Sequence, residues 1–241
     1  MVSVRVERTD PDEGVCTGTA VGEHWVVTAR HCVEAARKLE PTVRTGQGDM
    51  QKVYEVDRWE IAPRGDIAML HTLQPMQLSR FAGVADAAPS GDVNVYGWSS
   101  DGSGGSTELP SAVGEVKGES PLALFDAPSA LEVGLKDGAR IQPGDSGGAV
   151  FSGGDVAGIM SAGLFEDPEN PTEEEMTSNA AVAVAPVADQ AAWIRDVMAQ
   201  PEVMKYPDAQ APDTVRVAAL GLGGVALLGA ALWATRRRRS A

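Results

Sequence analysis

Short apolar runs, rather than helical repeats, fill most of the chain before residue 187. Each run is rich in Val, Ala or aromatic residues, and segments rich in Gly, Pro, Ser and Asp separate the runs. Runs of this length bounded by turn residues are typical of strands in an all-β sandwich or barrel. We therefore predict strands at Val2–Val6, Trp25–Ala29, Val53–Val56, Ile67–Leu70, Val93–Trp98, Ala149–Phe151, Val156–Ser161 and Ala180–Val184.

The pattern changes twice toward the C-terminus. Between Val187 and Ala199 small and apolar residues recur at helical spacing, which predicts an amphipathic helix that ends before Pro201. The segment 215–235 is almost wholly apolar, and it is long enough as a helix to cross a bilayer core of about 30 Å. Because Arg236–Arg239 follow directly, we expect this transmembrane helix to place residues 236–241 in the cytoplasm.

These patterns predict a domain at residues 1–199, a linker at 200–214, a membrane span at 215–235 and a basic tail. We expect the linker to be extended, because it holds Pro201, Pro207 and Pro212. Glycines in the span would allow two helices to pair, so a homodimer is one expectation. The segment Ala211–Val215 is faintly similar to the Leu-Pro-x-Thr-Gly sorting signal of cell-wall-anchored proteins, which leaves wall attachment as an alternative.

Charge and composition narrow the functional classes. The formal net charge is −14, which argues against binding to nucleic acid. The sequence contains neither a metal-binding His pair nor a nucleotide-binding loop, so we expect no metal and no cofactor. The abundance of Ala, Gly, Val and Arg suggests a bacterial origin.

Three short motifs carry candidate chemistry, in the order His, Asp, Ser. They are Val26-Val27-Thr28-Ala29-Arg30-His31-Cys32, Arg64-Gly65-Asp66-Ile67-Ala68-Met69-Leu70 and Gly144-Asp145-Ser146-Gly147-Gly148. A serine hydroxyl becomes a nucleophile at neutral pH when an imidazole takes its proton and a carboxylate orients that imidazole. The third motif also fits the G-x-S-x-G pattern of α/β-hydrolases, but those enzymes carry the His after the Ser, and every histidine here precedes Ser146. The subtilisin order would need Asp10 or Asp12, neither of which lies in a strand-like setting.

On these motifs, residues 2–199 resemble the chymotrypsin-like (trypsin-like) serine proteases. The resemblance implies two six-stranded antiparallel β-barrels and a C-terminal helix. It also implies Ser146 as nucleophile, His31 as general base and then acid, and Asp66 as the group that orients His31. The backbone N–H groups of Gly144 and Ser146 would form the oxyanion hole, and protein or peptide would be the substrate. A disulfide between Cys16 and Cys32 is implied as well, with two reduced cysteines as the alternative.

The resemblance also points to residues for specificity. The residue six positions before the nucleophile, here Arg140, would lie at the base of the primary pocket and would favour an acidic substrate side chain. The alternative is that Arg140 faces solvent or pairs with Asp137 or Asp145. Ser161, Ala162 and Gly163 would pair with the extended substrate backbone. The acidic stretch Glu166–Glu175 is predicted to form a loop beside the pocket.

The sequence thus predicts a membrane-anchored serine endopeptidase whose catalytic domain is extracytoplasmic. Residues 1–20 lack an apolar signal core, and the family's usual activating N-terminus is missing. We therefore expect further residues upstream of Met1 in the natural precursor; a cytoplasmic, tail-anchored protease is the alternative. Two other classes remain open, a catalytically silent binding module at the membrane and a cell-wall-linked surface protein.

Overall fold

In the computed structural model, residues 1–6, 15–34, 41–46, 50–98, 110–125, 130–165, 167, 170 and 172–200 are described. Residues Met1–Gln200 form one compact unit. The predicted membrane span and basic tail, and all of the predicted linker except Gln200, lie outside the described residues. Within the described part, no helix has the length and apolar character needed to cross a bilayer.

The first half of the unit is a closed antiparallel barrel. Its six strands follow one another around the barrel in the order β1-β2-β3-β6-β5-β4. Valines and other apolar residues of these strands point into the barrel, where Val4, Val26 and Leu70 are fully buried. The strands are β1 (Val2–Arg5), β2 (Val15–Ala20), β3 (Trp25–Thr28), β4 (Thr42–Thr45), β5 (Lys52–Ile61) and β6 (Ala68–Thr72).

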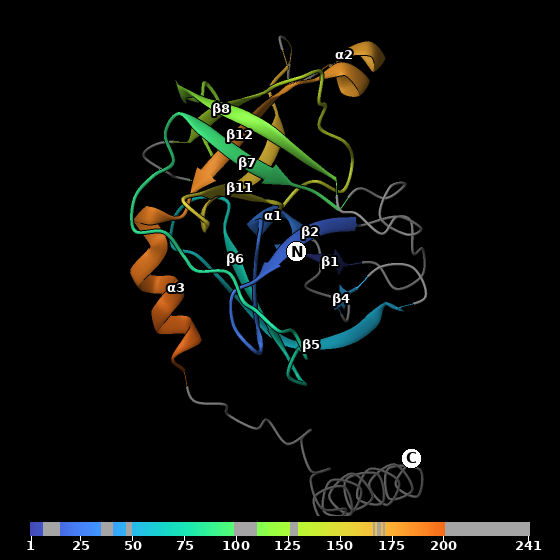
Figure 1. Cartoon of the computed structure of the whole chain (residues 1–241), viewed down its shortest axis with the longest axis vertical. Helices are drawn as coiled ribbons and strands as arrows, with labels where there is room; N and C mark the ends of the chain where they lie inside the picture. The colour runs from blue at the N-terminus through green and yellow to red at the C-terminus, as the bar shows by residue number, and fades with distance from the viewer. Residues whose placement is uncertain are drawn as a thin grey trace, which may run out of the picture. The chain divides into compact units, whose positions relative to one another are not determined.

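The second half is another closed antiparallel barrel, drawn above the first in Figure 1. Its order around the barrel is β10-β11-β12-β9-β8-β7. The predicted fold class, two six-stranded antiparallel barrels of chymotrypsin type, is therefore confirmed for this unit. The strands are β7 (Asp92–Tyr96), β8 (Ser111–Glu119), β9 (Leu131–Leu135), β10 (Ala149–Ser152), β11 (Asp155–Gly163) and β12 (Ala181–Pro186).

Helices are few and short in the described residues. The predicted closing helix is confirmed as a 3-10 turn, η2 (Ala188–Gln190), that continues into α3 (Ala191–Met198). The other two helices, α1 (Arg30–Glu34) and α2 (Glu173–Ser178), were not predicted. The expectation of an acidic loop was wrong for Glu173–Glu175, because a capping box between Thr172 and Glu175 starts α2 there.

A separate cluster of buried apolar residues, which includes Val95 and Val184, lies within the second barrel, and one larger apolar core extends across both barrels. It contains side chains of the first barrel such as Val26, side chains of the second such as Ile159, and Ile194 and Val197 of α3. The segment between the barrels also bonds to both, because Ala82 N–H donates to Ala20 and Gly83 accepts from Val156 N–H. The loops that carry the three motifs are thus mounted on two barrels that pack together.

Candidate active site

The pairing of two strands brings His31 and Asp66 together. In the first barrel β3 pairs with β6, with Thr28 opposite Ala68. His31 lies in α1 just after β3, and Asp66 lies just before β6. In an antiparallel pair the end of one strand meets the start of the next, so the two motifs lie at the same edge of the barrel.

Asp66 holds His31 by two hydrogen bonds. Its Oδ1 accepts from the His31 backbone N–H at 2.9 Å, and its Oδ2 lies 2.7 Å from Nδ1 of the ring. The Asp66 side chain is 1% exposed and that of His31 is 38% exposed. An ionised carboxylate only accepts, so this contact places the ring proton on Nδ1 and leaves Nε2 of neutral His31 as a base.

The Ser146 loop rests on the first barrel through Thr17, a fully buried residue of β2. Thr17 N–H donates to the Ser146 carbonyl at 2.7 Å, and its hydroxyl donates to the Gly144 carbonyl, also at 2.7 Å. The same hydroxyl accepts from Trp98 N–H at 2.8 Å. Although β2 and this loop are far apart in sequence, these bonds fix the loop beside His31.

Backbone N–H groups in the loop divide into two sets. Those of Asp145, Gly147 and Gly148 donate within the protein, to the carbonyls of Gln142, Met160 and Asp145. Among the hydrogen bonds of the described residues, neither Gly144 N–H nor Ser146 N–H donates. Gly144 adopts a φ of +99°, a conformation that glycine reaches without strain. The two N–H groups expected to form the oxyanion hole are therefore not used by the fold.

Asp145, the residue before the candidate nucleophile, bonds within its own loop. Its Oδ2 accepts from Gln142 N–H at 2.9 Å, and its Oδ1 packs closely on Gly97. The carboxylate is thereby directed at the backbone around it.

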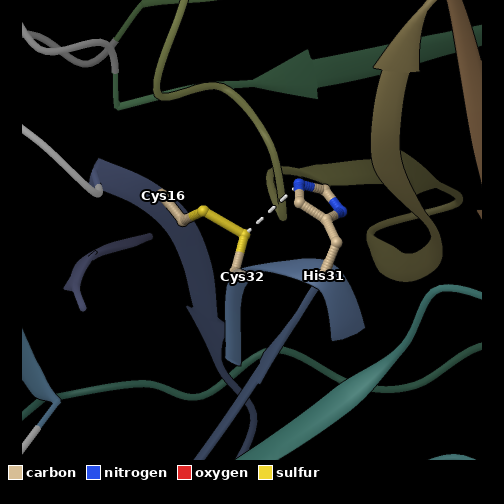
Figure 2. Close-up of side chains that lie close together, drawn as sticks. All are labelled: Cys16, His31 and Cys32. Carbon is tan, nitrogen blue, oxygen red and sulfur yellow. Dashed lines mark hydrogen bonds between the residues drawn. A yellow bond between two sulfur atoms is a disulfide. The ribbon is translucent and has the colours of Figure 1, made fainter. Parts of the chain in front are cut away.

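The disulfide between Cys16 and Cys32 is present and links β2 to α1. Figure 2 shows the two sulfur atoms beside the His31 ring, whose Nε2 lies 3.7 Å from Cys32 Sγ. The Ser146 carbonyl oxygen contacts the same sulfur at 3.9 Å, so His31 and Ser146 border one space. Within the described residues, no hydrogen bond joins His31 Nε2 to the Ser146 hydroxyl. Such catalytic hydrogen bonds are often long without substrate.

Cys16, Cys32 and His31 also form a group of three potential metal ligands in the described part of the chain. Zinc binds cysteine as a thiolate. Since both sulfur atoms belong to the disulfide, this group does not offer a thiolate, and it supports no metal site in the oxidised protein.

A pocket of about 220 Å³ opens beside Ser146. Ser161, Ala162 and Gly163, which were expected to bind substrate, all line it. Four larger apolar side chains also line it, Ile141, Met160, Phe165 and Val182, and the rest of the lining is Gln142, Pro143, Asp145 and Ser146.

Arg140 does not line this pocket, so the expectation of a basic pocket is corrected. Its guanidinium Nη1 donates to the carbonyls of Gly138 and Ala139, at 2.8 and 3.0 Å, and the residue is exposed. Ile141, the next residue, faces the pocket instead. Counting back from Ser146 was misleading because the direction of a loop side chain depends on local contacts that spacing does not encode.

Sequence reasoning also missed residues that shape the site. The apolar pocket wall and the bridging role of Thr17 depend on tertiary contacts, and nothing in their local sequence marks them. Asn179 is another such residue, because it bonds to three segments around the pocket.

Comparison with known proteins agrees with this arrangement. The family model described as Trypsin matches residues 1–194. A Corynebacterium glutamicum protein described as an uncharacterized peptidase is 27% identical over 186 residues, which cover 74% of this chain and 62% of that protein. The chain thus spans less than two thirds of that relative.

Two solved structures are similar in fold. Neuropsin, a serine protease from mouse brain, aligns over 82% of this chain and 93% of its own, with 20% identity and a TM-score of 0.60. An inactivated protease paralogue of the scabies mite aligns over 82% and 91%, with 16% identity and a TM-score of 0.57.

The chain belongs to the trypsin family of chymotrypsin-like serine proteases.

Proposed function

We propose that this protein is a serine endopeptidase that hydrolyses peptide bonds through His31, Asp66 and Ser146. The observation that carries the proposal is the pair of hydrogen bonds that Asp66 accepts from His31, next to a loop that carries Ser146. Ser146 Oγ would attack the scissile carbonyl while His31 Nε2 takes its proton. The acyl-enzyme forms when His31 returns that proton to the leaving amine, and water then hydrolyses the ester by the same route.

The substrate class follows from the pocket beside Ser146. An apolar substrate side chain, such as Phe or Leu, would bury its surface against Ile141, Met160 and Phe165. A charged side chain would lose its hydration in the same place. We therefore propose cleavage after apolar residues.

A fluorophosphonate probe, which reacts with activated serines, tests the mechanism on the full-length chain. We expect rapid labelling of the wild type and none of Ser146→Ala. Asp66→Asn should keep the fold but lower the labelling rate by about 10⁴-fold, because the wrong tautomer of His31 is favoured. Equal labelling of Asp66→Asn and wild type would contradict the proposed role of Asp66.

A second candidate is a catalytically silent binding module that keeps the fold. This alternative rests on the 3.7 Å contact of His31 Nε2 with Cys32 Sγ, which in a silent module would persist when a peptide is bound. One of the similar structures is itself described as an inactivated protease paralogue. Failure of the folded wild type to label, together with binding of an unmodified apolar peptide to the pocket, would support it.

We further propose that residues 215–235 anchor the protein in the membrane, with the protease domain outside and the C-terminus in the cytoplasm. The support is the apolar run followed by Arg236–Arg239. Deletion of residues 215–241 should release the protein from the membrane fraction. Release of the intact protein by cell-wall hydrolases instead of detergent would favour the wall-linked alternative, and protease shaving of intact cells checks the orientation.

A further inference from the structure

The pocket beside Ser146 is enclosed by segments that no covalent cross-link joins. Its walls come from Ile141 in the loop before Ser146, from Gly163 at the end of β11 and Phe165 just after it, and from Val182 of β12. The chain has two cysteines, and both belong to the Cys16–Cys32 bond. The spacing of these walls therefore depends on non-covalent contacts.

Asn179 contacts all three segments. Its side-chain Nδ2 donates to the Leu164 carbonyl and its Oδ1 accepts from Ala181 N–H, both at 2.8 Å. Its backbone carbonyl accepts from Ile141 N–H at 3.0 Å. Asn179, just after α2, thus bonds to backbone groups of the segment after β11, of β12 and of the loop that contains Ile141.

The same residue lies against the wall at Gly163. A Cβ added to Gly163 would come within 2.9 Å of three atoms: Asn179 Nδ2, Ile141 Cδ1 and Phe165 Cζ. These three side chains therefore meet around the glycine. A shift of Asn179 would therefore move the pocket wall at Gly163, against which a substrate side chain would pack.

We propose that Asn179 is a positioning residue that determines specificity, by holding the Ile141 and Leu164 segments at the spacing that fits a large apolar side chain. It acts through these segments rather than by contact with substrate. The proposal rests on the proposed function for the pocket. Removal of the amide leaves a carbonyl and an N–H unpaired in a partly buried place. The walls then relax, and discrimination between large and small side chains falls.

The test compares two peptides that differ only in Phe or Ala before the scissile bond, cleaved by the full-length wild type, Asn179→Ala and Asn179→Asp. We expect the ratio of kcat/KM for Phe over Ala to fall about tenfold in both variants, the size of effect that one altered apolar contact produces. The rate of fluorophosphonate labelling should change much less than this ratio, because Gly144 and Ser146 keep their hydrogen bonds to Thr17. Ser178→Ala is the matched control: Ser178 is exposed on the same helix, and its variant should retain the wild-type ratio.

Asn179→Asp keeps the acceptor for Ala181 but places an oxygen against the Leu164 carbonyl, so it tests the Nδ2 contact even if Asn179→Ala unfolds. A wild-type Phe/Ala ratio in both folded variants would overturn the proposal. A wild type that is never labelled would instead overturn the proposed function. In that case, NMR titration of the Ser146→Ala protein with a peptide ending in Phe measures pocket binding alone, and equal affinity with and without Asn179→Asp would overturn the role of Asn179.

Discussion

The hydroxyl of Thr17 links the two barrels at the candidate nucleophile. It accepts from Trp98 N–H and donates to the Gly144 carbonyl. Thr17→Val keeps the shape but leaves the buried Trp98 N–H and the partly buried Gly144 carbonyl unpaired, at a cost of about 1–3 kcal/mol for a buried group. We expect kcat to fall at least about tenfold through displacement of Ser146, with little change in KM. Thr17→Ser, which keeps the hydroxyl, should have nearly the wild-type kcat. Steady-state kinetics would contradict this role if Thr17→Val kept the wild-type kcat.

Gly147 has both an unusual backbone angle and no room for a side chain. Its φ is +82°, and an added Cβ would lie 2.2 Å from the Thr17 carbonyl and 2.3 Å from the Thr28 hydroxyl. Gly147→Ala must therefore move the loop, and we expect it to abolish fluorophosphonate labelling. Gly153→Ala is the control, since Gly153 has a φ of +62° and open space around it. That variant should lose about 1–2 kcal/mol of stability and still be labelled.

Strands could be predicted from sequence where the apolar runs are buried. Every predicted run overlaps a strand, and Val26–Val27 and Leu70 are fully buried. Strand β8 was missed because most of its residues face solvent and Gly114 and Gly118 interrupt it. Strand β2 was not delimited because its interior is small and partly polar, although Thr17 is fully buried. Strands β4 and β9 were not predicted either. In each case pairing with neighbours, rather than local pattern, makes the strand.

A charge pair on β8 gives a prediction at the scale of one strand. Lys117 Nζ donates to Glu115 Oε2 at 2.5 Å. This hydrogen bond, with the charge of Lys117, lowers the pKa of Glu115. Because the pKa of the folded state is depressed, the pair stabilises the fold above the ordinary Glu pKa, and this contribution disappears as pH falls through the lowered value.

We expect Lys117→Met to raise the pKa of Glu115 toward its ordinary value, as measured by NMR titration of the carboxyl carbon. The effect on the free energy of unfolding should be small, since both side chains are exposed. Lys52→Met is the control, because Lys52 lies on β5 of the first barrel and bonds to Gln77, away from Glu115. An unchanged Glu115 titration in Lys117→Met would contradict the assignment.

At the scale of the molecule, the sequence predicted the candidate catalytic residues better than it predicted the residues that line the pocket. The three motifs identified His31, Asp66 and Ser146, since each motif is local. The structure brings His31 to Asp66 by strand pairing. The lining of the pocket depends on the directions in which side chains of several loops point. Arg140 points away from the pocket and bonds to the carbonyls of Gly138 and Ala139, which its spacing from Ser146 could not predict.

The shared core predicts that both barrels unfold together. Helix α3 buries Ile194 completely in a core that includes Val26 of the first barrel and Ile159 of the second. Arg195 of the same helix bonds to Asp86 and to the Val84 carbonyl, in the segment between the barrels.

Ile194→Ala should therefore lower the free energy of unfolding by about 2–5 kcal/mol and shift a single calorimetric transition. Amide exchange should quicken in strands of both barrels to a similar extent. Asp196→Ala, on the exposed side of the same helix, is the matched control and should have a smaller effect. Two separate transitions, with only one shifted by Ile194→Ala, would mean that the barrels unfold independently. The hydrogen bonds of Thr17, without the shared core, would then align the Ser146 loop with His31.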